Sequence, residues 1–305
     1  MWSFDVPNNE GVKKLILPQI IKEFFTKEGS WKFILRYNYP EEIMTKYVSK
    51  QPNSSGLIDW APAENQTWQT LVERQTEIVK TRACAEFLEG LERIQFSKTH
   101  VPQHTEINRR LKDFSGWEVE VVPALIPAKE FFTLLANKKF PAASFIRIPE
   151  ELDYIQEPDI FHEFYGHVPL LTFKDYANFM EEFGKLALSA DPKDRRRLFR
   201  IFWFTVEFGL LNTEEGIRAY GGGMLSSIHE TVYSVEGPKA LRVPFDPLTA
   251  LRTPYRIDIP QPLYYVLNKF DDLYKILDFD LMGLLEESKA LGDFEPLFEP
   301  AGEEL

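Results

Sequence analysis

Two histidines flank an acidic residue in one apolar stretch of the chain. His162, Glu163 and His167 lie in the segment EPDIFHEFYGHVPLL, residues 157–171, and the whole chain holds only 5 histidines. Imidazole nitrogens and carboxylate oxygens are the groups that proteins use to bind zinc or ferrous iron. A spacing of four residues, as in the zinc proteases, places two histidines on one face of an α-helix. The spacing of five found here would leave them about 140° apart in an ideal helix.

The residues around the second histidine allow the helix to unwind, so that both rings could reach one ion. Gly166 precedes His167 and Pro169 follows it, and both residue types weaken a helix. Asp159 stands before the apolar run, where its carboxylate could cap the start of the helix. We therefore expect a helix that begins after Asp159 and frays near His167.

A third metal ligand is expected from Glu207, in the segment RIFWFTVEFGLL. The residues around it are apolar on nearly every side of a helix, which indicates burial. A buried carboxylate is costly unless a partner compensates its charge. An arginine could do so, with the histidines as core residues, but the combination favours one metal ion bound by all three side chains. This ligand set suits both catalytic zinc and non-haem Fe(II), and the aromatic surroundings favour iron.

Composition restricts the possible partners and the compartment. The chain has 305 residues and a formal net charge of −12, which disfavours binding to nucleic acid. No apolar stretch reaches the roughly 20 residues of a membrane span, and no signal peptide is recognisable. The single cysteine, Cys84, reads as a buried residue inside a helix and fits a reducing compartment. We expect a cytoplasmic protein, and a monomer, because no C-terminal helix has a strong heptad seam.

The elements that must position these residues are mostly α-helical, with a few short β-strands. The alternation in WEVEVVPAL predicts a strand before Pro123. Apolar residues at helical spacing predict helices over residues 67–94, 104–116, 128–140, 177–190, 194–212 and 262–277.

Four segments together resemble the pterin-dependent aromatic amino acid hydroxylases. They are EPDIFHEFYGHVPLL, FWFTVEFGLL, AYGGGMLSS and PQPLYYV, and their order and intervals also agree with that family. The resemblance covers residues 58–275, leaving 1–57 as a lead segment of unassigned role and 276–305 as an acidic tail. It is greatest to the compact bacterial members that hydroxylate phenylalanine. It implies the catalytic-domain fold of the family, a helical basket around non-haem iron.

The resemblance also implies an activity and two cofactors. Fe(II) would be bound by His162, His167 and Glu207, and a tetrahydropterin would supply electrons. The reaction would be the hydroxylation of the ring of L-phenylalanine to L-tyrosine with O2, as part of phenylalanine catabolism. Glu163, next to the first ligand, would point at the pterin as a catalytic residue, although it could instead be a solvated helix residue.

The pterin would lie against the segment VPALIPAKEFF. Phe131 would stack on the pterin ring, and the backbone of Leu125, Ile126 and Ala128 would meet its polar edge. A planar heterocycle binds well between an aromatic face and main-chain donors and acceptors. By pattern alone, Phe131 reads as an ordinary core residue.

The substrate site would be formed by residues from several segments. Arg147 would bind the amino acid carboxylate in bidentate fashion, although by position alone it reads as a surface residue. The ring pocket, an additional hydrogen bond and a brace for His162 or the substrate would come from Trp203, Phe208, Pro158, Ser226 and Glu230.

Other substrates and another class of enzyme remain as alternatives. Ile257 stands where tyrosine-specific members carry an aspartate, which suits phenylalanine, but an apolar pocket cannot strongly reject an added hydroxyl. Tyrosine or tryptophan could therefore be the preferred substrate. A zinc-dependent hydrolase could use the same three ligands with Glu163 as general base. A non-catalytic metal- or pterin-binding protein is the third possibility.

Overall fold

Helices predominate over short strands in residues 47–123 and 125–298, the part of the chain that this computed structural model describes. These residues belong to a compact unit that begins at Met44, so most of the predicted lead segment 1–57 lies outside them. The helices are α2 (Pro62–Val79), α3 (Ala85–Ile94), α4 (His104–Phe114), α5 (Ala128–Ala136), α6 (Val168–Leu171), α7 (Lys174–Ser189), α8 (Arg195–Phe202), α9 (Gly222–Leu225), α10 (Ile228–Glu236), α11 (Pro247–Arg252), α12 (Asp272–Lys275) and α13 (Leu281–Leu291). Two π-helical turns, η2 (His162–His167) and η3 (Trp203–Glu207), and two 3-10 turns, η1 (Pro149–Glu151) and η4 (Ile276–Asp278), complete the helical elements.

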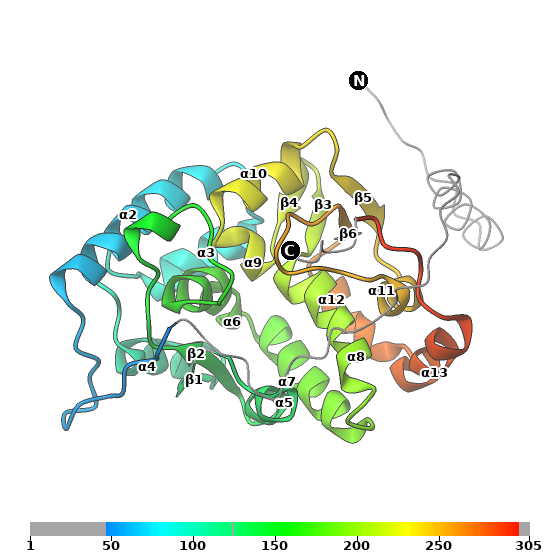
Figure 1. The fold of residues 1–305 in the computed structure, drawn as a ribbon, viewed down its shortest axis with the longest axis horizontal. Coiled ribbons are helices and arrows are strands. Elements are labelled where there is room, and N and C mark those ends of the chain that lie inside the picture. Colours follow the sequence, from blue (N-terminus) through cyan, green and yellow to red (C-terminus); the bar gives the residue numbers. More distant parts are fainter. Residues whose placement is uncertain (1–46, 124, 299–305) are drawn as a thin grey trace, which may run out of the picture. The chain divides into compact units, whose positions relative to one another are not determined.

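Two small sheets frame the π-helical turns. Strands β1 (Glu118–Val122) and β2 (Lys139–Ala143) form a parallel pair joined through α5. Strands β3 (Leu210–Thr213), β4 (Gly216–Ala219), β5 (Leu241–Pro244) and β6 (Leu263–Leu267) form a sheet of order β4-β3-β6-β5. Turn η2 packs against β2, turn η3 packs against β6, and α9, which is labelled in Figure 1, contacts both turns. The two π-helical turns are thereby brought together between the sheets.

The predicted helix over residues 67–94 is two helices, which is a correction. The chain leaves α2 after Val79 and re-enters a helix only at Ala85. Between them, the Cys84 N–H donates to the Ala219 carbonyl (2.9 Å), and the Ala219 N–H donates to the Arg82 carbonyl (2.7 Å). Cys84 therefore stands at a helix start and not in a helix interior, although it is fully buried as predicted. Burial raises the pKa of its thiol, so it stays protonated.

Three more predicted helices contain strands, which is a correction: the helix predicted over 194–212 is α8 and η3 followed by the start of β3, and the other two are 262–277 and 128–140. The segment 262–277 opens with β6, which pairs with β3 on one side and β5 on the other. Leu263, Tyr264 and Tyr265 are all buried, and a strand covered on both faces reads as a continuous apolar run without a period of two. Similarly, the predicted helix 128–140 ends at Ala136 and continues into β2.

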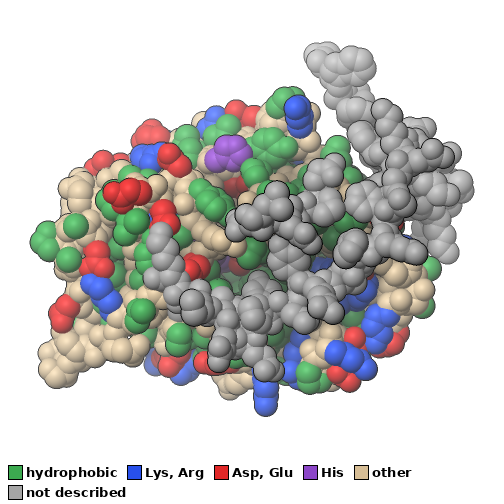
Figure 2. Space-filling view, viewed as in Figure 1, with side chains coloured by type: hydrophobic (Ala, Val, Ile, Leu, Met, Phe, Trp, Pro, Cys, Tyr) green, Lys and Arg blue, Asp and Glu red, His purple; other side chains and the backbone are tan. Residues whose placement is uncertain are grey.

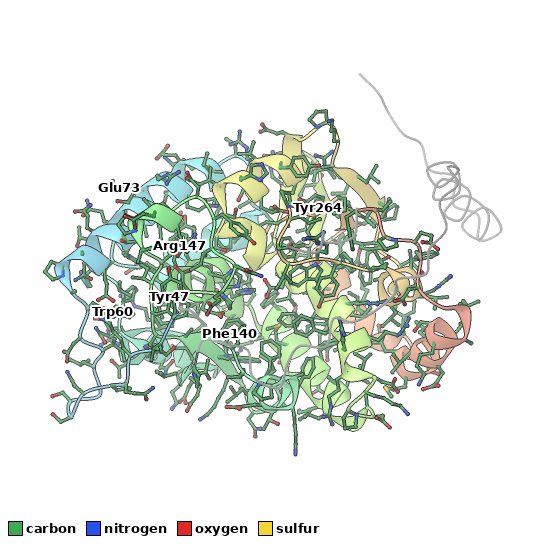
Figure 3. All side chains as sticks on the ribbon, in the orientation of Figure 1. Tyr47, Trp60, Glu73, Phe140, Arg147 and Tyr264 are labelled. Atoms are coloured by element: carbon green, nitrogen blue, oxygen red, sulfur yellow. The ribbon has the colours of Figure 1, made fainter. Side chains whose placement is uncertain are left out.

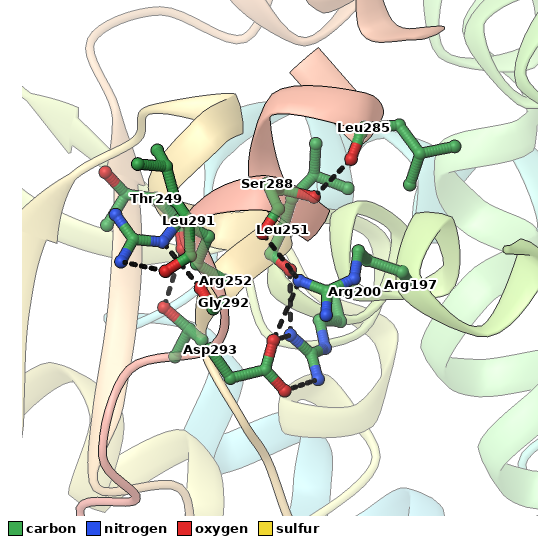
Figure 4. Close-up of polar contacts among 11 residues, drawn as sticks. Arg197, Arg200, Thr249, Leu251, Arg252, Leu285, Ser288, Leu291, Gly292 and Asp293 are labelled. Atoms are coloured by element: carbon green, nitrogen blue, oxygen red, sulfur yellow. Dashed lines mark hydrogen bonds and ion pairs between the residues drawn. The ribbon is translucent and has the colours of Figure 1, made fainter. Parts of the chain in front are cut away.

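The described part of the predicted acidic tail packs against α11 and α8. Helix α13 packs against α11, with Leu285 fully buried. Asp293 then accepts hydrogen bonds from Arg200 at 2.7 and 2.8 Å and forms an ion pair with Arg197 at 2.8 Å (Figure 4). These arginines lie on α8, which leads directly into η3. The tail thus contacts α8, the helix directly before the turn that carries Glu207.

Charge is distributed without a large patch of one sign on the face seen in Figure 2, where acidic and basic side chains are interspersed. None of the described helices is long and apolar enough to cross a membrane.

Candidate active site

The two histidines are positioned by a π-helical turn. In a π-helix the backbone hydrogen bonds join residues five apart, so residue i+5 lies over residue i. In η2 this brings the Nε2 atoms of His162 and His167 to 3.1 Å from each other. The expected fraying at Gly166 and Pro169 is wrong, because the turn continues directly into α6. A spacing of five, unsuited to an α-helix, matches the helix type that the chain adopts here.

Glu207 converges on the same point from the second π-helical turn. Its carboxylate oxygens lie 3.3 Å from His167 Nε2 and 3.7 Å from His162 Nε2. Among the described residues its ion-pair contacts are to these histidines and not to an arginine. Two imidazole nitrogens and one carboxylate are thus close enough together to share one metal ion.

The protonation states of this cluster suit a cation. Burial lowers the pKa of His162 to about 4, so its ring is neutral at pH 7. Burial would raise the pKa of Glu207, but the neighbouring His167 and His162 hold it below its usual value, so the carboxylate is ionised. Metal binding requires neutral imidazole and ionised carboxylate, and His162 and Glu207 are in these forms at pH 7.

Glu163 is a second carboxyl group beside the cluster. One ligand atom of each of His162, Glu163 and His167 lies within 4.8 Å of the others. Burial raises the pKa of Glu163 well above its usual range, and the nearby Glu207 and Asp159 raise it further. Glu163 is therefore buried in the site and is not a solvated helix residue.

A buried ion pair joins the predicted substrate arginine to the first histidine. Arg147 Nε and one terminal nitrogen bind the two oxygens of Asp159 at 2.8 and 2.9 Å. The same carboxylate accepts the backbone N–H of His162 (3.0 Å), which is the predicted helix cap. The surface position considered for Arg147 is wrong, since its side chain is 4% exposed (labelled in Figure 3). Burial raises the pKa of Asp159, but contact with Arg147 outweighs it and holds the pKa low.

Ser226 contacts the first histidine. Its hydroxyl donates to the Gly222 carbonyl (2.9 Å) and lies 3.0 Å from His162 Nδ1. Because that hydroxyl proton is used, Ser226 accepts from Nδ1–H, which leaves Nε2 with a lone pair for a cation. The sequence assigned Ser226 to the substrate, and the structure shows its contact with a candidate metal ligand.

Three glycines form a wall against the candidate ligands. A Cβ atom on Gly221 would lie 2.3 Å from the Glu207 carbonyl oxygen, and one on Gly223 would lie 3.0 Å from Glu207 Oε2. Side chains here would displace η3. Sequence reasoning used AYGGGMLSS only as part of a resemblance and missed this role, although three successive glycines at the start of a helix signal a close backbone approach.

Aromatic rings line the side of the site next to Glu207. Trp203 lies 4.6 Å from Phe208 and stacks on Tyr255 at 4.3 Å, measured between ring centroids. Its indole N–H donates to Gln261 Oε1 (3.1 Å). Pro158 is half-buried directly before Asp159. Tyr255 and Gln261 were not expected from the sequence, because no local signal joins their loop to Trp203.

Glu230 contacts this loop rather than His162. Its Oε1 atom accepts the backbone N–H of Gln261 (2.9 Å) and the hydroxyl of Tyr264, which is labelled in Figure 3. Burial raises the pKa of Glu230, and the hydrogen bonds from Tyr264 and Gln261 oppose that rise. The predicted brace therefore acts on the loop beside Trp203.

The predicted pterin segment lies beside α8, the helix that leads to Trp203. Phe131, on α5, is half-buried and makes edge-to-face contacts with Phe199 (5.8 Å) and Phe202 (5.2 Å) of α8. Phe202 directly precedes Trp203, so α5 and the aromatic wall are linked through α8. Leu125 and Ile126 are half-buried and Ala128 is exposed. These positions leave both the core role and the pterin role open for Phe131.

Comparison with known proteins identifies the family of this chain. Residues 30–280 match the biopterin-dependent aromatic amino acid hydroxylases. The chain belongs to this family. The expected fold class is thereby confirmed, as is the expected dependence on a biopterin-type cofactor.

Relatives of this hydroxylase are similar along most of their length. It is 50% identical over 256 residues to the phenylalanine-4-hydroxylase of Pseudomonas aeruginosa, covering 84% of this chain and 97% of the relative. The apo structure of the cold-active phenylalanine hydroxylase of Colwellia psychrerythraea has a TM-score of 0.80 and 50% identity, covering 82% of this chain and 97% of that one. The Chromobacterium violaceum phenylalanine hydroxylase with bound oxidized Fe(III) has a TM-score of 0.77 and 38% identity, covering 84% and 92%.

Proposed function

We propose that this hydroxylase converts L-phenylalanine to L-tyrosine, with Fe(II), a tetrahydropterin and O2. The observation that carries the proposal is the convergence of His162, His167 and Glu207, whose ligand atoms lie 3.1 to 3.7 Å apart. The relatives support it, since they are named phenylalanine hydroxylases and one of their structures holds iron. The zinc hydrolase and the non-catalytic binding protein are not favoured, because the chain belongs to a hydroxylase family.

The donor set fits iron. Two neutral nitrogens and one anionic oxygen from three side chains are the usual ligands of non-haem Fe(II) that reacts with O2. When bound, the ferrous ion and the tetrahydropterin supply the electrons and the coordination sites for O2 activation. The hydrogen bond from His162 Nδ1–H to Ser226 fixes the ring with Nε2 toward the ion.

The other residues of the site would bind and orient the two organic molecules. Arg147 uses Nε and one terminal nitrogen for Asp159, so its remaining N–H groups would have to bind the substrate carboxylate. Trp203 and Phe208 would hold the phenyl ring beside Glu207, with Pro158 completing the pocket. Phe131 and the backbone of residues 125–128 would hold the pterin. Glu163, buried beside the two histidines, would contact the pterin or a water molecule beside it.

Phenylalanine is the proposed substrate because Ile257, an apolar residue, stands where tyrosine-specific members of the family carry an aspartate. Ile257 offers no charged group to a phenol, and its carbonyl is bound by Tyr154 (3.2 Å). A hydroxylated ring would therefore gain no hydrogen bond from Ile257.

An aerobic assay tests the proposal. The purified chain is loaded with Fe(II), given a synthetic tetrahydropterin, and supplied separately with phenylalanine, tyrosine and tryptophan. We expect tyrosine from phenylalanine at the highest kcat/KM, no product when zinc replaces iron, and no product from His162→Ala. Higher kcat/KM for tyrosine or tryptophan would overturn the substrate assignment, and hydrolytic activity with zinc alone would overturn the reaction class.

We further infer a cytoplasmic monomer that acts in phenylalanine breakdown, with residues 58–275 as the catalytic domain. Sequence supports the monomer, since no heptad seam was found at the C-terminal end. Sedimentation velocity of the full chain over a hundredfold range of concentration tests it. A dimer has twice the mass of the monomer and would therefore show a larger sedimentation coefficient.

A further inference from the structure

We propose that Gln261 is a positioning residue that fixes the indole of Trp203 and thereby controls which aromatic ring the site accepts. The inference rests on the proposed function, because it treats Trp203 as a wall of the substrate pocket. It concerns a residue that lies outside the candidate metal centre.

Every polar atom of the Gln261 side chain has a partner. Its Oε1 accepts the indole N–H of Trp203 (3.1 Å), and its Nε2 donates to the carbonyls of Arg256 (2.8 Å) and Ile259 (3.2 Å). Its backbone N–H donates to Glu230 (2.9 Å). The residue is 2% exposed, so these hydrogen bonds do not compete with bulk water.

These contacts dictate which way the Gln261 amide faces. Two carbonyl oxygens can be satisfied only by the NH2 group, so the oxygen must point to the indole. Glutamate at this position would place a carboxylate against both carbonyls, and methionine would fill the space without a hydrogen bond. Glutamine is thus suited to join the loop carbonyls of Arg256 and Ile259 to the indole N–H.

Trp203 is held by the same loop on a second side. Its ring stacks on Tyr255 at 4.3 Å and packs on Phe208 at 4.6 Å. Stacking lets a ring slide or rotate in its own plane, whereas a hydrogen bond at one edge fixes that rotation. Gln261 therefore supplies the in-plane restraint that Tyr255 and Phe208 do not.

The consequence concerns substrate choice and not metal binding. A ring wall that can rotate would accept larger or differently placed rings and would hold phenylalanine less well for attack. We expect Gln261→Met to lower kcat/KM for phenylalanine about five- to tenfold, in line with the loss of one buried hydrogen bond. We also expect discrimination against tryptophan to weaken, and more tetrahydropterin to be oxidised without product. The KM for the pterin and the iron content should stay as in the wild type.

A double-mutant cycle with Trp203→Phe tests whether Gln261 acts through the indole. Phenylalanine has no N–H to donate, so Gln261→Met in the Trp203→Phe background should change the ratio of phenylalanine to tryptophan turnover less than twofold. If each substitution instead changed this substrate ratio by the same factor in either background, the two would act independently, and the proposal would be overturned. A Gln261→Met variant with the selectivity and coupling of the wild type would overturn it as well.

Gln75→Met is the matched control for loss of a buried glutamine. Gln75 is 1% exposed and donates to the Leu225 carbonyl (2.7 Å) and Thr231 (3.0 Å), without contact to Trp203. It should lower the melting temperature but leave the substrate ratio unchanged. If Gln75→Met lost as much selectivity as Gln261→Met, general destabilisation would explain both effects. That result would contradict the proposal.

A measurement without turnover separates this inference from the proposed function. In a 15N-labelled chain, the indole N–H resonance that disappears in Trp203→Phe should shift and exchange faster with solvent in Gln261→Met. An unchanged resonance would contradict the positioning role even if phenylalanine is hydroxylated. A shifted resonance in Gln261→Met, together with a wild-type chain that makes no tyrosine, would overturn the proposed function alone.

Discussion

Asp159 connects two parts of the site through a single carboxylate. It binds Arg147 through both oxygens and caps the backbone N–H of His162, and both side chains of the ion pair are buried. Sequence reasoning recognised the cap from the position of the residue. It could not place Arg147, because nothing in the local pattern shows that a charged residue faces inward. The pairing becomes visible only when residues 147 and 159 are brought together by the fold.

Asp159→Asn should test this connection through stability. Removing one charge of a buried pair leaves the Arg147 guanidinium uncompensated, which costs about 3 kcal/mol. Urea unfolding of the metal-free protein at pH 7 measures it. A loss below about 1 kcal/mol would contradict the role of the pair.

The same pair predicts how stability depends on pH. The pKa of Asp159 is lower in the folded chain than its usual 3.8, so its contribution is complete above that value and is lost as pH falls through the lower folded pKa. The difference in free energy of unfolding between wild type and Asp159→Asn should therefore become smaller below about pH 4. A constant difference between the two proteins from pH 7 to pH 3 would contradict the assignment.

At the level of elements, the π-helical turns explain what the sequence could and could not predict. The spacing of His162 and His167 indicated a departure from α-helical geometry, but Gly166 and Pro169 suggested unwinding instead of a wider helix. Glu207 was found from its apolar surroundings, which report burial without specifying helix type. Strand β6 was missed because its buried residues lack a period of two.

The close approach of the glycine wall to η3 gives a prediction at this scale. Gly221→Ala should push the Glu207 carbonyl away and cost about 2 kcal/mol of stability, because the Cβ would lie 2.3 Å from that oxygen. Fe(II) affinity should fall as well, since Glu207 moves with its backbone. Titration of the folded variant with Fe(II) checks this, and wild-type affinity would show that η3 does not depend on the glycine.

At the scale of the whole molecule, the described tail residues connect distant parts of the catalytic unit. Asp293 binds Arg197 and Arg200 on α8, while Phe294 lies under the Arg252 guanidinium at 4.1 Å (Figure 4 shows the Asp293 contacts). Sequence reasoning separated residues 276–305 as an acidic tail, because acidic composition resembles that of a solvated segment. It could not show that one of these acids has two arginine partners.

Asp293→Asn should therefore destabilise the protein by about 1 kcal/mol, a modest value because the group is partly exposed. Asp191→Asn is the control, since Asp191 is 53% exposed and lies 3.6 Å from Lys193. Its effect should be close to zero. Equal values for the two variants in urea unfolding would show that the tail contact adds nothing.

The central claim is that His162, His167 and Glu207 bind one ferrous ion that the hydroxylation requires. The most direct test measures iron bound per chain, and tyrosine formed per tetrahydropterin oxidised, in wild type and in Glu207→Gln. Wild type should bind one iron and form close to one tyrosine per pterin. Glu207→Gln should lose iron and slow tyrosine formation more than about 100-fold, beyond the effect of losing a residue that only supports a ligand. Tyrosine formation at the wild-type rate and ratio by Glu207→Gln would contradict the account.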